Sequence, residues 1–169
     1  ELPSVTAAIA GGTFGTDTTN EALSATFTAS TTASGAASNL NDGSSSTVWV
    51  SDATATQTLT ADMGSAKVLY FYWLTATTSA PENAPGTFTL HGSATGAWAG
   101  EEVLLMTVTN DPPWSAGERR RYNISSPGSY QYYRLTVTAV AGAASTAPPQ
   151  GGTGRITYDG SGSAYVGGL

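Results

Sequence analysis

The loop formed by residues 39–49, NLNDGSSSTVW, places a carboxylate, several hydroxyls and a tryptophan close together in the chain. Asp42-Gly43 is a turn-forming pair, because Asp hydrogen-bonds nearby backbone and Gly adopts a positive φ without steric cost. Such a loop can bring oxygens of Asp42 and Thr47 to one point, as a hard cation such as Ca²⁺ requires. The indole of Trp49 needs an apolar slot and a hydrogen-bond acceptor. The alternative interpretation is a β-turn followed by a core tryptophan.

A candidate sugar-binding site lies in residues 110–122, NDPPWSAGERRRY. Trp114 can stack on a sugar ring while Asp111 or Arg119 binds hydroxyl groups. The two prolines before Trp114 stiffen the loop, which lowers the entropy lost on binding. Asp52, on another loop, is a further candidate. The alternative is that Trp114 folds back into the core and that a neighbouring glutamate forms a local ion pair with one arginine, worth little in stability.

Catalytic constellations are hard to find in this sequence. His91 is the only histidine, and no Gly-x-Ser-x-Gly segment accompanies it. A hydrolytic triad needs a nucleophile, a base and an orienting group within mutual reach. The acidic residues fall mostly at turns, and their spacing singles out no pair suited to glycoside hydrolysis. The sequence therefore predicts a protein that is not an enzyme.

The composition excludes several functional classes. Of the 169 residues only 11% are charged, and the formal net charge is −6 with six Lys and Arg in total. Nucleic-acid binding requires clustered basic residues, so we expect none. There is no cysteine to form a disulfide or a thiolate metal site. No apolar run approaches the roughly 18 residues that span a bilayer, so we predict no membrane span.

Short β-strand patterns dominate the chain between these sites. Most of the segments are rich in β-branched or aromatic residues, and Gly, Pro, Asn or Asp bound them. Several alternate, as in Tyr133, Leu135 and Val137 on one face of a strand. We expect an all-β, jelly-roll sandwich of about eight antiparallel strands. The expected strands are residues 25–30, 47–51, 57–63, 68–77, 87–93, 102–108, 119–124 and 131–139.

Four pieces of the sequence, taken in order, resemble the discoidin or coagulation factor 5/8 C-terminal domain family. That superfamily includes the family 32 carbohydrate-binding modules and other galactose-binding-like β-sandwiches. The resemblance covers about residues 22–159 and implies a jelly roll with a non-catalytic binding role. It also places Trp98 at a position that usually belongs to the core. The pieces are ATFTASTTASG with NLNDGSSSTVWVS, QTLTADMGSAKVLYFYWLTAT, TFTLHGSATGAWAGEEVLL and SYQYYRLTVTAV.

The same resemblance implies a structural Ca²⁺ beside the Asp-Gly turn. Carried over by position, its ligands are Asn39, Asp42, Ser44 and Thr47, with the backbone near residues 154–155. The chain departs from the family here, because Arg155 appears in GRITYDG near where relatives often place a glutamate. Ca²⁺ takes six to eight oxygens and gains affinity with each carboxylate. An ion pair between the arginine and Asp42 is therefore the alternative to the metal.

We expect three regions: an N-terminal arm over residues 1–21, the sandwich over 22–159 and a Gly-rich C-terminal arm over 160–169. The run VLYFYWL at residues 68–74 is apolar on both faces, which predicts that an arm or another subunit covers its outer side. The sequence favours an extracellular or virion-surface module, such as a bacteriophage component, that binds a glycan or host surface. The alternatives are a structural decoration or fibre protein acting through subunit contacts, and an accessory carbohydrate-binding module of a secreted glycosidase.

Overall fold

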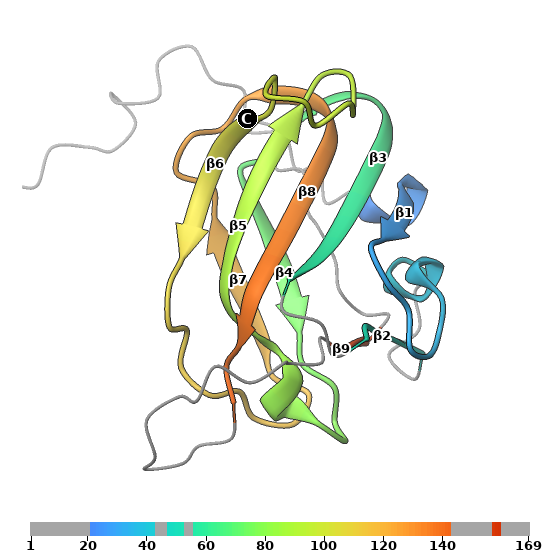
Figure 1. Cartoon of the computed structure of the whole chain (residues 1–169), viewed down its shortest axis with the longest axis vertical. Coiled ribbons are helices and arrows are strands. Elements are labelled where there is room, and N and C mark those ends of the chain that lie inside the picture. The colour runs from blue at the N-terminus through green and yellow to red at the C-terminus, as the bar shows by residue number, and fades with distance from the viewer. Residues whose placement is uncertain (1–20, 43–46, 53–55, 143–156, 160–169) are drawn as a thin grey trace, which may run out of the picture.

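A five-stranded antiparallel sheet forms the larger layer of the molecule (Figure 1). The structure is a computed structural model that describes residues 21–42, 47–52, 56–142 and 157–159. Alternating apolar and hydroxyl side chains favour strands with one buried face and one polar face. The strands, in their order across the sheet, are β1 (Thr26–Ala29), β3 (Gln57–Val68), β8 (Ser129–Val140), β5 (Pro85–Ser93) and β6 (Val103–Val108).

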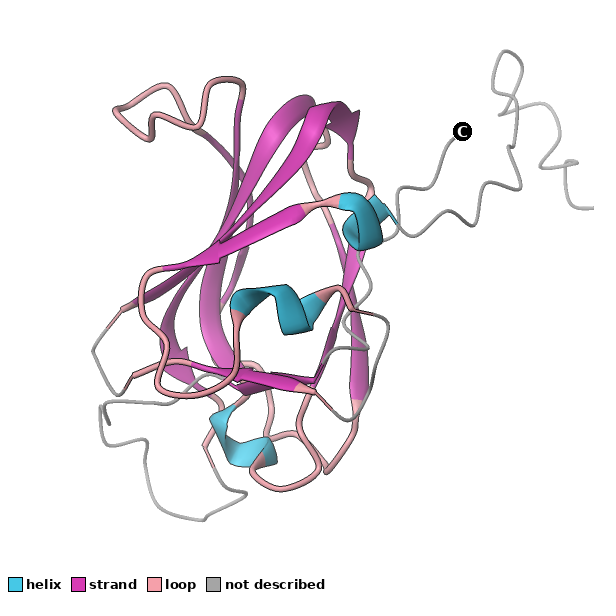
Figure 2. Ribbon diagram, turned by 90° about the vertical axis from the view of Figure 1, so that its right-hand side faces the viewer, coloured by secondary structure: helices cyan, strands magenta, loops and turns pink. Residues whose placement is uncertain are grey.

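Two antiparallel strand pairs make up the opposite layer. In the described residues, β4 (Phe71–Thr75) pairs with β7 (Arg119–Asn123), and β2 (Val48–Val50) pairs with β9 (Thr157–Asp159). Figure 1 shows β4 and β7 behind the large sheet, and Figure 2 shows the layers from the side. Within the described ranges, three short 3₁₀ helices join these strands, η2 (Glu21–Ser24), η3 (Ala37–Leu40) and η4 (Pro81–Asn83). The prediction of an all-β sandwich is confirmed.

The inner faces of the two layers enclose one apolar core. Tyr133, Leu135 and Val137 alternate into it from β8, as predicted. Trp49 of β2 is fully buried at 0% exposure, and its indole Nε1 donates to Thr32 Oγ1 at 3.1 Å. The slot and the acceptor that the sequence demanded for Trp49 are both present.

The apolar run at residues 68–74 is divided between the two layers, which corrects the prediction of one strand over 68–77. Val68 pairs with Ser129 in the large sheet, after a register shift between Asp62 and Lys67. The chain then crosses between the layers and starts β4 at Phe71. Odd- and even-numbered residues of this run are both apolar, partly because the run contributes residues to both layers of the sandwich.

The strands that the structure describes, from β1 to β9, lie within residues 22–159, the predicted sandwich. The predicted arms, residues 1–21 and 160–169, fall almost entirely outside the described residues. Among the residues that are described, no helix has the length and hydropathy needed to cross a bilayer.

Candidate functional site

Trp114 lies in the core and offers no stacking surface, which corrects its predicted role in sugar binding. Its side chain is only 6% exposed, and its indole Nε1 donates to the carbonyl of Pro85 at 3.1 Å. Its ring lies beside Tyr122, with centroids 6.4 Å apart. The guanidinium of Arg120 covers it, 4.2 Å from the ring centroid. The alternative interpretation, that Trp114 folds back into the core, is the one the structure supports.

Arg120 holds the loop around Trp114 in one conformation. Its Nη1 donates to Asp111 Oδ2 and to the Pro112 carbonyl, both at 2.7 Å, and its Nη2 donates to the Pro113 carbonyl at 2.8 Å. Its Nε donates to Glu118 Oε1 at 2.7 Å. These bonds engage the guanidinium on all sides, so Arg120 positions the loop and has little capacity left for a ligand.

The other predicted ligand residues do not converge on one point. Asp111 accepts hydrogen bonds from Arg120 and from the Tyr122 hydroxyl, so its carboxylate belongs to the loop clamp. Asp52 is exposed, and its backbone N–H donates to Thr31 Oγ1 at 3.0 Å. Arg119 lies on the outer face of β7 and stacks on Trp73.

The outward side chains of β4 and β7 form a surface that sequence reasoning found only in part. The register pairs Trp73 with Arg121 and Phe71 with Asn123, which puts these residues and Arg119 on one side of the strand pair. Alternate residues of the same strands point into the core. We call Phe71, Trp73, Arg119, Arg121 and Asn123 the β4–β7 outer face.

Arginine stacks on both aromatic rings of the β4–β7 outer face. The Cζ of Arg121 lies 3.9 Å from the Phe71 ring centroid, and the Cζ of Arg119 lies 4.6 Å from that of Trp73. Both arginines are exposed and both rings are half-buried, whereas Thr75, next in the row, is buried. The stacking supplies part of the cover that we predicted an arm or another subunit would provide.

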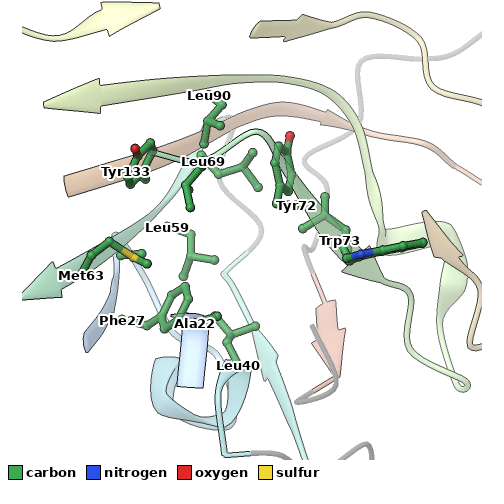
Figure 3. Close-up of a pocket in the computed structure, with 13 residues that line it drawn as sticks. Ala22, Phe27, Leu40, Leu59, Met63, Leu69, Tyr72, Trp73, Leu90 and Tyr133 are labelled. Carbon is green, nitrogen blue, oxygen red and sulfur yellow. The ribbon is translucent and has the colours of Figure 1, made fainter. Parts of the chain in front are cut away.

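A cavity of about 80 Å³ lies between the layers, with Trp73 at its edge and apolar side chains around it (Figure 3). Figure 3 shows Tyr72 and Leu69 among the lining residues, while the indole of Trp73 extends away from them. Small-molecule sites usually measure about 300–1,000 Å³. This cavity is therefore too small to hold a sugar ring.

Trp98 is half-buried on the β5–β6 connection and lies outside the buried core, so the core position that the resemblance implied is wrong. The side chain of Glu101 organises this loop, because it accepts hydrogen bonds from the hydroxyls of Ser93 and Thr95 and from the backbone N–H of Trp98. Trp98 takes a φ of +53°, which is uncommon for a residue other than glycine. The guanidinium of Arg134 lies 3.8 Å from its ring centroid.

The described part of the predicted calcium loop supplies a single carboxylate, so it offers few of the oxygen ligands that Ca²⁺ needs. Asp42 is exposed, and its Oδ2 accepts a hydrogen bond from Thr47 Oγ1 at 2.7 Å. Asn39 donates through Nδ2 to the Val48 carbonyl at 2.8 Å, which ties the loop to β2. Ser44 and Arg155 lie outside the described residues, as does the proposed ion pair with Asp42. A bound Ca²⁺ remains a prediction, and these residues alone do not fit its need for six to eight oxygens.

The perturbed acids and phenols of the described chain serve packing and loop structure. Among these residues no three His, Asp or Glu side chains gather as metal ligands do. Burial raises the pKa of Tyr133 to about 12, and it also raises the pKa values of Tyr72 and Tyr122. The hydrogen bond from Arg120 lowers the pKa of Glu118. No nucleophile, base and orienting group come together in this part of the structure.

The sequence-based prediction did not distinguish the three consecutive arginines, of which Arg120 holds a loop while Arg119 and Arg121 stack on aromatic rings of the outer face. The alternation signal was available, because residues 119 and 121 share one side of a strand and residue 120 takes the other. What the sequence could not supply was the register against β4, which decides which aromatic ring each guanidinium meets.

Comparisons with solved structures identify the fold of this chain. No protein-family model matches the chain, and no curated protein sequence matches it. A family 32 carbohydrate-binding module from Clostridium perfringens, solved with GalNAc-β-1,3-galactose, superposes with a TM-score of 0.62 at 14% identity, covering 80% of this chain and 91% of that one.

Two other solved structures show the same fold. A chitosan-binding module of a Paenibacillus chitosanase/glucanase gives a TM-score of 0.59 at 20% identity over 83% of this chain and 97% of that module. A fucolectin from striped bass serum gives 0.62 at 15% identity over 82% of this chain and 46% of the lectin. The chain therefore has the all-β sandwich fold that these solved structures share, as its sequence predicted.

Proposed function

We propose that this protein is a non-catalytic glycan-binding module and that the β4–β7 outer face is its binding surface. The observation that carries the proposal is the pair of half-buried aromatic rings, Phe71 and Trp73, each stacked with an exposed arginine. The exposed part of an aromatic ring offers apolar contact to the C–H groups of a sugar, and guanidinium N–H groups donate to its hydroxyls. Similar solved modules are described in complex with sugars, which supports the same class of ligand.

The placement of these side chains on strands favours recognition over catalysis. Strand residues lose little freedom on binding, because the sheet and the stacked rings already hold them. The β4–β7 outer face carries no carboxylate or histidine at an outward position of either strand, so it has no group suited to general acid–base chemistry. A surface of this kind holds a glycan without cleaving it.

Affinity gel electrophoresis against a panel of soluble polysaccharides, followed by calorimetry on the best ligand, tests the proposal. We expect Trp73→Ala to weaken binding at least tenfold. Trp98→Ala is the matched control, because Trp98 is also a half-buried tryptophan stacked with an arginine but lies on the β5–β6 connection. It should leave the affinity within twofold of the wild type.

Two results contradict this assignment. Equal affinity of the wild type and the folded Trp73→Ala variant would show that the β4–β7 outer face is not the binding surface. Failure of the wild type to bind any polysaccharide or oligosaccharide of a broad array would remove glycan binding itself.

An alternative role, a structural protein of a phage particle or another assembly, has its own supporting observation. Val103 and Leu104 on the edge strand β6 are 43% and 51% exposed. Exposed apolar residues on a sheet edge favour contact with another chain. Light scattering on the purified protein decides this, because subunit contacts of useful strength give a mass above that of one chain.

The setting that accompanies glycan binding is an extracellular one. The fold matches isolated binding modules over 89–97% of their length in several cases, which supports an accessory module beside a carbohydrate-active domain. A location on a virion surface stays a prediction from the composition of the chain.

A further inference from the structure

We propose that the cavity between the two layers is a binding site for a small apolar molecule, of the size of xenon or a short hydrocarbon. The site is lined from both layers of the sandwich and from the 3₁₀ helices η2 and η3. Of the residues of the β4–β7 outer face, Trp73 alone lines the cavity, at its edge. The proposal therefore goes beyond glycan binding and does not depend on it.

A small residue between two large rings on the inner face of the large sheet opens the space. Ala61 of β3 lies directly opposite Phe27 of β1 on one side and Tyr133 of β8 on the other. Directly opposed side chains on one face of a sheet have Cβ atoms about 4.5–5.5 Å apart, so the short side chain of Ala61 leaves room between the two rings. All three residues line the cavity.

Short 3₁₀ helices form part of the cover over this end of the large sheet. Helix η2 contacts β3 and supplies Ala22 to the lining, while η3 contacts β1 and supplies Leu40. Phe27 and Ala61 pack against the core and are nevertheless only half-buried. The core is therefore less completely covered here than in the middle of the sandwich, which gives a small molecule a route to the cavity.

The lining selects an apolar ligand, because its residues are alanine, leucine, methionine and aromatic residues. The hydroxyl of Tyr133 donates to the carbonyls of Lys67 and Gly128, and Figure 3 shows the hydroxyl of Tyr72 on the far side of its ring from Leu59. A buried water needs about two to four polar partners, which these residues do not supply. An apolar molecule instead gains dispersion contacts with the wall.

The volume of the cavity limits the size of its ligand. At about 80 Å³ it has roughly half the volume of an engineered apolar cavity of about 150 Å³ that takes up benzene or xenon. We therefore expect the wild-type protein to bind xenon and to exclude benzene. Leu59→Ala removes part of the wall and enlarges the cavity, so this variant should admit benzene.

Xenon titration of the whole protein, followed by NMR of the methyl groups, tests the proposal. We expect shift changes concentrated on the methyl groups that line the cavity, such as those of Leu40, Leu59 and Met63. Ala61→Leu fills the space between the two rings and should weaken xenon binding at least tenfold. Ala139→Leu is the matched control, because it makes the same change at an exposed position of β8 and should leave binding unchanged.

Three results of the xenon titration overturn the proposal: no shift at the lining methyl groups, shifts of equal size at the exposed Leu104, or an Ala61→Leu variant that binds xenon as tightly as the wild type. If Ala61→Leu does not fold, the Leu59→Ala variant decides. Benzene should raise the thermal midpoint of Leu59→Ala and leave that of the wild type unchanged, since a ligand stabilises only the folded protein that binds it. An equal effect on both proteins, or none on either, contradicts the proposal.

Discussion

At the scale of single residues, the tryptophans of this protein divide into core residues and surface residues. Trp49 and Trp114 are buried and use their indole N–H groups on internal acceptors. Trp73 and Trp98 are half-buried, and each is stacked with an arginine. A tryptophan on a loop is therefore no guide to a ligand site until its burial is known.

We predict that Trp114→Ala lowers the free energy of unfolding by about 3–5 kcal/mol, the usual range for deleting a large buried aromatic side chain. It also removes the bond to Pro85 and the ring under Arg120. Urea denaturation followed by circular dichroism measures the loss. Trp114→Phe keeps most of the volume and should lose less, which provides a result if the alanine variant does not fold. A loss below about 1 kcal/mol for Trp114→Ala would contradict the packing described here.

The sequence predicted the buried strands better than the loops because burial on a strand leaves a periodic signal. Residues 131–139 alternate, and Tyr133, Leu135 and Val137 are buried as expected. Trp114 lies on a loop without a period, so no pattern distinguishes an inward from an outward ring. The position of the Trp114 ring depends on Arg120. The partners of Arg120 come from several positions along the loop, so they are known only from the folded structure.

At the scale of elements, β4 and β7 show how a two-stranded pair gains cohesion beyond its backbone hydrogen bonds. Each arginine of the β4–β7 outer face reaches a ring on the opposite strand, so Arg121 links to Phe71 and Arg119 to Trp73. Cross-strand pairs on one face are a main source of stability for sheets. On the inner face Tyr72 and Tyr122 stack with centroids 5.4 Å apart.

We predict a coupling free energy of about 0.5–1 kcal/mol between Phe71 and Arg121, as expected for an exposed cation–π pair. A double-mutant cycle with Phe71→Leu and Arg121→Gln isolates it by urea denaturation. The control cycle combines Phe71→Leu with Arg119→Gln, since Arg119 stacks on Trp73 instead. Coupling as large in the control cycle would mean that the arginines act through general charge and not through stacking.

The crossing at residues 69–70 marks a limit of sequence reasoning about elements. The run at residues 68–74 has no turn residue to show that Val68 ends one sheet and Phe71 starts the other. The register shift between Asp62 and Lys67, which carries β3 as far as Val68, depends on pairing with β8. Pairing between distant strands leaves no local signal, so the type of each element was predictable and its boundary was not.

At the scale of the whole molecule, a carboxyl group of a loop limits stability at acidic pH and buried tyrosines of the core limit it at alkaline pH. The hydrogen bond with Arg120 is the largest cause that lowers the pKa of Glu118. Glu118 therefore stabilises the folded protein fully above its unfolded pKa of roughly 4.3, and this stabilisation is lost as pH falls through the folded pKa. Burial raises the pKa of Tyr133 to about 12. A tyrosine in the unfolded chain titrates near pH 10. The stabilisation of the folded protein by neutral, buried Tyr133 is therefore complete below about pH 10 and is lost as pH rises through the pKa in the folded protein.

We therefore predict that the urea midpoint is flat from about pH 6 to 9 and falls on both sides of that window. Glu118→Gln should flatten the acid side, because its neutral side chain cannot lose charge. Tyr133→Phe should make the fall on the alkaline side less steep, because buried Tyr72 and Tyr122 still contribute to it, and should lower the midpoint at every pH through loss of the hydroxyl's bonds to the carbonyls of Lys67 and Gly128. A midpoint unchanged between pH 9 and 11 would show that the phenol hydroxyls of the core open to solvent more easily than their burial implies.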